Sequence, residues 1–420
     1  MTTLSVQRGT GIGTKLLSYS LATLLSLLVI HPWIDYPIPV VVNSHAWLYA
    51  VVASGLFGFA LLFQPIHLAL KCLVVYLFAS CFLAQIPYLA FNAYFFVVAG
   101  TYLYLAFTRV DWKIILNFLC AAFWLEVLLV CFQLAGMDRL MNANRPEPVF
   151  LGTVMQYMRF ATVLAVLTPF LLIKSKWYFI PIVILCVFSQ SSTFALALGV
   201  FVTSYALITL QTTRSRMIAL ILVACAIGAY AIYDFGSFHG AIVASNGGRF
   251  PSWWSALQTW VIDTSAMPKP SPHLVGEFQW RWFLFGHGMD SFLPLFPIYK
   301  HDLNPFPQAH NAYIQWLWEI GIIGFGLIAW FMGSLLRDLY KYRQRLLFCG
   351  ALSIATVLFF AFPDRMMQSA LLLVAYCAFS TVEIEHQIKL QSNIMFFGSD
   401  QEVNKRKSQN QLRSVEHAGV

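Results

Sequence analysis

Long apolar runs separated by short polar stretches extend along almost the whole chain. About 20 apolar residues suffice for a helix to cross the roughly 30 Å hydrocarbon layer of a membrane, and the pattern contains about twelve such runs. The predicted helices are Leu16–Pro32, Ala46–Phe63, His67–Ile86, Tyr88–Phe107, Ile114–Ala135, Val154–Ile173, Trp177–Gln190, Thr193–Leu210, Met217–Tyr233, Ala312–Leu336, Leu346–Phe362 and Gln368–Glu383. The sequence therefore predicts an all-α polytopic membrane protein with about 12 transmembrane helices.

One polar stretch interrupts this pattern and is too long for a simple connection. We expect four parts: N-terminal transmembrane helices 1–9 (1–233), a large external loop (234–311), transmembrane helices 10–12 (312–383) and a tail (384–420). The loop is rich in Trp and Phe, which suit the headgroup layer of a membrane. Short helices are predicted at Ser252–Val261 and Glu277–Phe285, lying on the outer leaflet. A packed cap over the helices without a ligand is the alternative.

Composition and charge agree with this topology. The chain is 59% hydrophobic and only 10% charged, with a formal net charge of +8. Lys and Arg gather beside helix ends that fall on one side in a twelve-helix arrangement, which predicts that both termini are cytoplasmic and the long loop faces outward. The positive charge is thus explained by topology, and no nucleic-acid partner is expected.

The candidate chemistry lies at the outward side. Arg159 is near the outward end of its helix, and the loop contributes Arg249, Arg281 and His310. Arginine holds diphosphate groups well because its guanidinium stays charged and binds two oxygens at once. The first outer loop has no Asp-x-Asp pair and no acidic cluster that would hold Mg²⁺ or Mn²⁺, so we expect neither a metal nor a cofactor.

His310 stands at the aqueous end of a predicted membrane helix. Its imidazole can exchange a proton near neutral pH, which suits a general base, but His310 and Asn311 could equally be an ordinary helix cap. Two buried acids, Glu126 and Glu319, are expected first of all to form structural ion pairs within the bundle.

Several motifs resemble those of the bacterial O-antigen ligases, in the wider O-antigen ligase/polymerase family. The His motif of that family, His-[Asn/Ser/Gln]-x9-Gly-x-x-Gly, matches His310, Asn311, Gly321 and Gly324. Further similar segments are Gly248-Arg249 with Trp253 and Trp254, Gly286-His287-Gly288, and Arg159 to Val163, where the family has Arg-x3-Leu. Phe325 departs from the pattern, since the ligases often carry Thr there.

The resemblance implies a GT-C-type glycosyltransferase on the periplasmic face of the bacterial inner membrane. It would transfer polysaccharide from undecaprenyl diphosphate to a sugar hydroxyl of lipid A-core, without metal. Arg159 and Arg249 would hold the diphosphate, with Arg281 as a third phosphate contact. His310 would act on the acceptor hydroxyl as general base or orient it, and Asn311 would contact substrate.

Other functions compete with the ligase. An O-antigen polymerase of the same family would join repeat units while both substrates stay on lipid carriers, and the sequence separates it poorly from a ligase. A lipid-linked glycan transporter is less favoured because the chain shows no internal repeat. A purely structural membrane scaffold would leave the outer Arg and His residues without a role.

Overall fold

The described part of the chain is entirely helical. The computed structural model describes residues 11–30, 46–134, 157–189, 191–210, 212–215, 217, 250–263, 277–299, 311–360 and 369–392. Within these residues there is no β-strand, and an isolated β-bridge joins Ile262 and Phe278. The all-α prediction is confirmed for this part of the chain.

Most helices coincide with the predicted apolar runs to within a few residues. Their bounds are α1 Ile12–Ile30, α2 Ala46–Leu61, α3 Leu68–Leu83, α4 Pro87–Phe107, α5 Trp112–Leu134, α6 Tyr157–Lys174, η2 Lys176–Tyr178, α7 Phe179–Ser189, α8 Ser192–Thr209, α11 Phe250–Thr259, α12 Trp280–Phe285, α13 Phe292–Tyr299, α14 Ala312–Lys341 and α15 Arg345–Phe360. Two of these, α11 and α12, correspond to the short helices predicted in the long loop. The predicted helix Met217–Tyr233 lies almost wholly outside the described residues.

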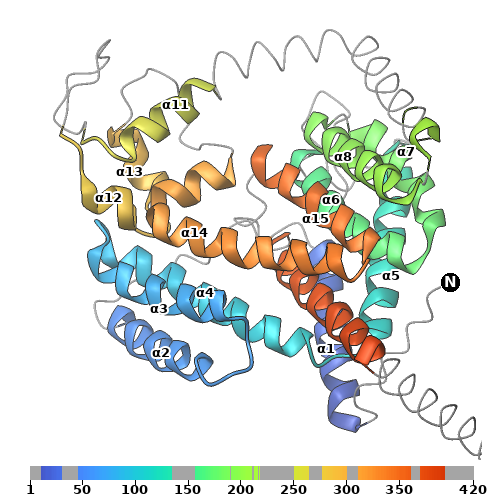
Figure 1. Cartoon of the computed structure of the whole chain (residues 1–420), viewed down its shortest axis with the longest axis horizontal. Coiled ribbons are helices and arrows are strands. Elements are labelled where there is room, and N and C mark those ends of the chain that lie inside the picture. The colour runs from blue at the N-terminus through green and yellow to red at the C-terminus, as the bar shows by residue number, and fades with distance from the viewer. Residues whose placement is uncertain are drawn as a thin grey trace, which may run out of the picture.

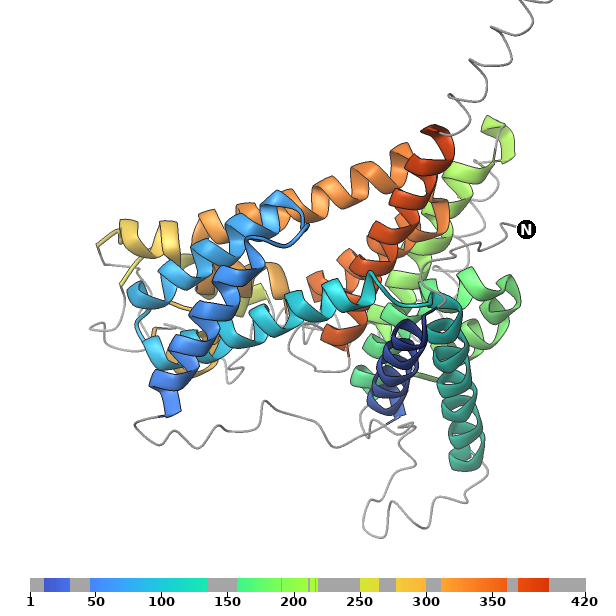
Figure 2. The same cartoon turned by 90° about the horizontal axis from the view of Figure 1, so that it is seen from below.

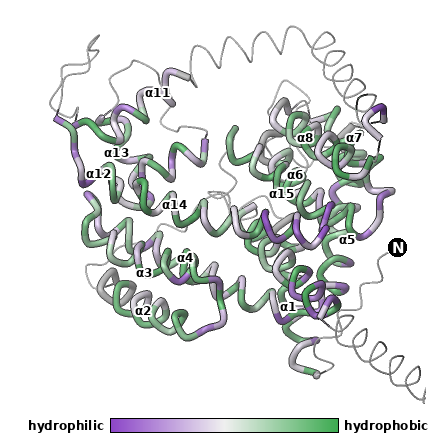
Figure 3. Tube along the Cα trace, viewed as in Figure 1, coloured by the Kyte–Doolittle hydropathy of each residue, from purple (hydrophilic) through white to green (hydrophobic). Residues whose placement is uncertain are grey.

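Among the described helices, three are long and apolar enough to cross a membrane by length and composition: α4, the Trp112–Phe132 part of α5, and α14. Shorter apolar helices accompany them, and hydrophobic residues (green) run along most of their length in Figure 3. Large apolar side chains such as Leu56 and Phe59 are 67% and 61% exposed, as suits contact with lipid. The chain thus has the character of an all-α membrane protein, while the count of twelve spans stays a prediction.

The helices fall into two groups that α14 connects. In Figures 1 and 2, α2, α3 and α4 lie with α11, α12 and α13 at one end of the molecule, and α5, α6, α7 and α8 lie at the other. The long helix α14 (orange) starts beside α11 and α13 and runs across to the second group, where it forms a hairpin with α15. This arrangement places the start of α14 among the short helices of the long loop.

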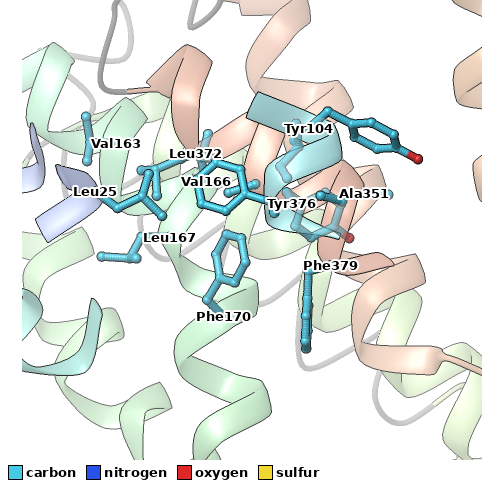
Figure 4. Close-up of a cluster of buried hydrophobic side chains, with 14 of the residues drawn as sticks. Leu25, Tyr104, Val163, Val166, Leu167, Phe170, Ala351, Leu372, Tyr376 and Phe379 are labelled. Carbon is cyan, nitrogen blue, oxygen red and sulfur yellow. The ribbon is translucent and has the colours of Figure 1, made fainter. Parts of the chain in front are cut away.

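The core of the second group is an aromatic and aliphatic cluster. Trp112 of α5, Phe170 of α6 and Phe379 lie within 6.2 Å of one another by ring centroid. Phe170 also meets the Tyr376 ring edge-on, and Val166 and Leu167 extend the cluster (Figure 4). Because lipid tails are as apolar as these side chains, close van der Waals packing holds the helices together here.

The C-terminal boundary differs from the prediction. The last apolar run was expected to end at Glu383, with a solvated tail from 384 onward, but the helix that starts at 369 continues to 392. Its final residues are mostly exposed and mix polar residues with Ile388 and Leu390, so the helix extends beyond the apolar run that the hydropathy pattern detects.

Candidate active site

Three of the five predicted site residues have no described side chain. Arg249 and His310 lie outside the described residues, and only the backbone of Arg159 is described, in the first turn of α6. Arg281 and Asn311 are described in full. The geometry of the site therefore comes from Asn311, Arg281 and the residues around them.

Asn311 is the N-cap of α14. Its Oδ1 accepts a hydrogen bond from the backbone N–H of Ile314 at 3.1 Å, and its backbone is extended with φ −151° and ψ 108°. Asparagine is among the best N-cap residues, since its short side chain returns to the third N–H of the helix. The sequence predicted that His310 and Asn311 could be an ordinary helix cap. The structure shows that Asn311 is the cap.

The helix that follows Asn311 is broken at Gly321, about two and a half turns after its start. Gly321 has φ 64° and ψ −177°, a backbone conformation that is essentially restricted to glycine. A continuous helix would place Gly321 and Gly324 on one face, and the break removes that arrangement, although both glycines are closely packed. The break leaves 312–320 as a short separate helix and 322–341, about 30 Å at 1.5 Å per residue, as the membrane-length part.

The three carbonyls just before the break have partners from other segments. The Trp318 carbonyl accepts from the His287 backbone N–H at 3.0 Å, and the Glu319 carbonyl accepts from the Gly288 N–H at 2.9 Å. The Ile320 carbonyl accepts from the Tyr76 hydroxyl at 2.6 Å. A helix can be broken in an apolar environment only when such groups are paired again, and here the segment after α12 and the side chain from α3 pair them.

Two glycines make this docking possible. Gly286, at the end of α12, has φ 73° and ψ −174°, nearly the same conformation as Gly321. A Cβ at Gly286 would overlap the backbone of Glu319 and Ile320, and a Cβ at Gly321 would overlap that of Leu284 and Gly286. The two backbones approach so closely that neither position has room for a side chain.

Gly324 lies against the ring of Tyr76 and leaves no room for a larger residue. A Cβ there would lie 2.7 Å from Cε1 of the Tyr76 ring. The Tyr76 hydroxyl reaches past this glycine to the Ile320 carbonyl and lies 3.1 Å from the Leu284 carbonyl. The Gly-x-x-Gly spacing thus combines one glycine for the backbone break with one for a packed tyrosine.

His287 is buried in an aromatic cluster, which we define as Trp253, Ala256, Trp282, Phe292, Phe296, Tyr299 and Trp318. Its ring stacks on Trp318 with centroids 3.8 Å apart and planes 8° from parallel. Its Nε2 lies 3.1 Å from the Thr259 carbonyl, and its Nδ1 lies 3.3 Å from Oε1 of Gln85. His287 therefore connects α11, α14 and the end of α3, which is a structural role.

This cluster corrects part of the interpretation of the loop aromatics. Trp253 and Trp282 are buried in it, so they pack within the protein and do not sit in the headgroup layer. Trp254 and Trp280 are 61% and 68% exposed and remain available for that layer. The loop aromatics thus divide between packing and surface.

Acidification is expected to destabilise the His287 cluster. Burial lowers the pKa of His287 from 6.5 to about 3 in the folded protein. Below pH 6.5 the unfolded state therefore binds a proton that the folded state does not, so stability falls by up to about 1.4 kcal/mol per pH unit as the pH drops toward 3. Unfolding of wild type and of His287→Asn in detergent, followed from pH 7 to 4, measures this term.

The Asn variant should be less stable at pH 7 but should lose less on acidification. Equal pH slopes for the two proteins would mean that His287 does not carry the dependence.

Glu319 is buried beside the break and accepts two hydrogen bonds. Its Oε1 lies 3.3 Å from the backbone N–H of Phe292, the first residue of α13, and 3.2 Å from Nε2 of Gln315. A carboxylate at a helix N-terminus is favourable because the helix dipole is positive there. These contacts give Glu319 a structural role, and its predicted ion pair stays a prediction.

Arg281 is exposed, and its guanidinium donates to the carbonyl of Leu83 in the last turn of α3. The helix dipole is negative at the C-terminus, so a cation there is favourable. Arg281 thus joins α12 to α3, and its predicted phosphate contact remains a prediction.

The helix starts that directly follow Arg249 and His310 in sequence meet at the end of α15. Trp253, in the first turn of α11, lies edge-on to the Phe359 ring at 5.4 Å, and Tyr313, in the first turn of α14, lies 6.3 Å from the same ring. The Tyr313 hydroxyl also donates to the Ala355 carbonyl at 3.0 Å. Two of the motif segments are therefore joined through α15.

The start of α6 faces a buried acid. Glu126 of α5 is only 3% exposed, and together with Phe160 and Val163 of α6 it lines a small cavity. Phe160 directly follows Arg159, so the first turn of α6 lies against Glu126. Described contacts do not join this turn to the start of α14.

Three described residues that organise the site were absent from the sequence analysis: Tyr76, Gln85 and Thr259. Each bonds to a carbonyl or ring of a residue more than 25 positions away. Their residue types and their neighbours in sequence do not identify these distant partners. A polar residue within or beside an apolar run was the one available hint.

No protein-family model matches this chain, and no curated protein is significantly similar to it. Function must therefore be argued from the motif residues and from the geometry around them.

Proposed function

We propose that this protein is an O-antigen ligase that transfers a polysaccharide from undecaprenyl diphosphate to a sugar hydroxyl of lipid A-core. One observation carries the proposal. Three separate segments of the resemblance, those containing Trp253, Gly286–Gly288 and Asn311–Gly324, form one connected cluster that includes three glycines at positive φ. Glycines that merely matched a pattern by chance would not be expected to depend on one another in this way.

The proposed reaction is a single displacement at the anomeric carbon of the lipid-linked glycan. His310 takes the proton of the acceptor hydroxyl as the hydroxyl oxygen forms the new glycosidic bond. The bond from the anomeric carbon to the diphosphate oxygen breaks, and undecaprenyl diphosphate leaves with the bonding electrons. Arg159 and Arg249 hold the diphosphate and offset its growing charge.

The orientation follows the distribution of Lys and Arg. Both termini are cytoplasmic, the loop 234–311 faces the periplasm, and the protein crosses the bacterial inner membrane about twelve times. Donor, acceptor and site are then on the same side of the membrane. The partners are the lipid-linked donor, lipid A-core and the surrounding membrane lipid.

The test is the lipopolysaccharide banding of a deletion strain. Loss of all O-chain together with accumulation of lipid-linked polymer supports a ligase. Core carrying a single repeat unit would instead indicate the polymerase of the same family, and unchanged banding would contradict both. Transfer by the purified protein with chelator present tests the absence of a metal requirement.

Arg249→Lys and Arg159→Lys are each expected to lose most transfer activity while the protein still inserts and accumulates. Lysine keeps the positive charge but not the planar fork that binds two phosphate oxygens. Transfer by each purified variant, at matched amounts of protein, measures the effect. Full activity of both Lys variants would assign these two arginines to topology or packing.

A further inference from the structure

Of the two polar atoms in the side-chain amide of Asn311, one has a hydrogen-bond partner and the other has none among the described residues. Its Oδ1 accepts from Ile314, but its Nδ2 is buried and has no acceptor among the residues that the structure describes, and Asn311 as a whole is 1% exposed. The N–H of Ile314 fixes the orientation of the amide, since a rotated amide would set a donor against a donor. A buried donor without an acceptor is unfavourable, so binding of an acceptor group next to the Asn311 Nδ2 would be favoured.

Two backbone donors lie beside it. An α-helix leaves its first N–H groups without an intrahelical acceptor, and in α14 these include the N–H groups of Ala312 and Tyr313. The Asn311 side chain satisfies only the third, at Ile314. Ala312 is 1% exposed and Tyr313 is half-buried, so the Ala312 N–H in particular is shielded from water. A hydrogen bond to an anion is stronger in such a shielded place than in water.

Another buried N-cap among the described helices differs from Asn311. Ser191 caps α8 by accepting from the N–H of Phe194 at 3.3 Å. Its hydroxyl oxygen is the one polar atom of its side chain, and this atom already has a partner in the cap, whereas the Asn311 Nδ2 has none among the described residues. The start of α14 is therefore set apart by a side-chain donor that capping does not require.

We propose that the start of α14 is an oxyanion pocket in which the Asn311 Nδ2 and the N–H groups of Ala312 and Tyr313 bind a phosphate group of the substrate. Convergent N–H donors at the positive end of a helix are a general way to bind phosphate. Phosphate as the occupant rests on the proposed function. In this pocket Asn311 is both the helix cap and a substrate contact.

Two substitutions separate these two roles. Asn311→Asp keeps a good cap acceptor but replaces the donor by a second acceptor that carries negative charge. Asn311→Gly removes the donor without adding charge and costs only a few tenths of a kcal/mol as a cap. Ser191→Gly is the matched control, because it removes a buried cap from another helix of the same chain.

The full-length proteins in detergent are to be tested for thermal protection by two probes, farnesyl diphosphate and glucose 1-phosphate. A ligand that binds only the folded state raises its stability by an amount that grows with the logarithm of the ligand concentration divided by Kd. We expect Asn311→Gly to weaken the apparent affinity of the preferred probe about tenfold to a hundredfold, the range for one hydrogen bond to a charged group. Asn311→Asp should abolish protection, and Ser191→Gly should retain it.

The two probes separate the sources of the phosphate. Selective protection by farnesyl diphosphate assigns the pocket to the lipid-linked donor, and protection by glucose 1-phosphate assigns it to a phosphorylated sugar. Wild-type protection in both Asn311 variants would reduce Asn311 to a cap, and a wild-type protein that neither probe protects has no such pocket. Because binding is measured without turnover, a protein that binds but does not ligate contradicts only the proposed function.

Discussion

Replacing His310 by alanine is expected to lower the turnover of glycan transfer by about two to four orders of magnitude, the usual contribution of general acid–base catalysis. The reason is that the acceptor hydroxyl would lose the group that takes its proton. Binding of the lipid-linked donor should survive, because the diphosphate is assigned to arginine side chains and to the start of α14. Transfer by the purified variant, with chelator throughout, measures the effect.

The structure sharpens the alternative for His310. A helix has one N-cap, and in α14 that position is filled by Asn311, whose Oδ1 already accepts from Ile314. Capping therefore leaves His310 without a function, and its loss should change stability little. His310→Asn is the informative companion: normal turnover in that variant would remove His310 from the chemistry.

Hydropathy was sufficient for the positions of most helices because each apolar run must be long enough to cross or pack within a membrane. The short helices α11 and α12 were also predicted, from aromatic patterning alone. Boundaries failed where a helix continues into polar residues, as it does beyond Glu383. The backbone hydrogen bonds of a helix can continue past the edge of an apolar run.

The candidate site was predictable only in part. Asn311 could be identified as a cap or contact because both roles are local in sequence. The partners of the broken helix could not, since Tyr76 comes from α3 and the Gly286–Gly288 segment follows α12. Long-range contacts of this kind depend on the tertiary arrangement, which a single sequence does not reveal.

His287 illustrates the same limit. In the sequence it belongs to the Gly286-His287-Gly288 segment that resembles the O-antigen ligases. In the structure its stacking on Trp318 and its contact with the Thr259 carbonyl occupy it within the protein. Burial also keeps its ring neutral, since its pKa falls to about 3.

The second large effect is expected at Gly321. Gly321→Ala would force a residue with a Cβ into a backbone conformation that costs about 1–3 kcal/mol outside glycine. The Cβ would also overlap the Leu284 carbonyl, so the segment after α12 would have to move away. That movement would break the hydrogen bonds to Trp318 and Glu319 and leave buried carbonyls unpaired. We expect loss of nearly all transfer activity and a lower unfolding temperature.

Gly326→Ala is the matched control on the same helix. Gly326 has no atom within 4 Å of an added Cβ, and its backbone is helical. Alanine there should be neutral or stabilising by up to about 1 kcal/mol, because it is the better helix former. If the two variants behaved alike, the break at Gly321 would have no part in holding the site.

Gly286→Ala should reproduce the defect from the opposite side of the contact, because its Cβ would overlap Glu319 and Ile320. Each substitution alone already separates the same two backbones, so little remains for the second one to disrupt. The loss of stability in the double variant should therefore be well below the sum of the two single losses, as for residues that share one contact. Additive losses would mean that the two glycines act independently, and the docking of the segment after α12 onto the broken helix would then not explain why both positions require glycine.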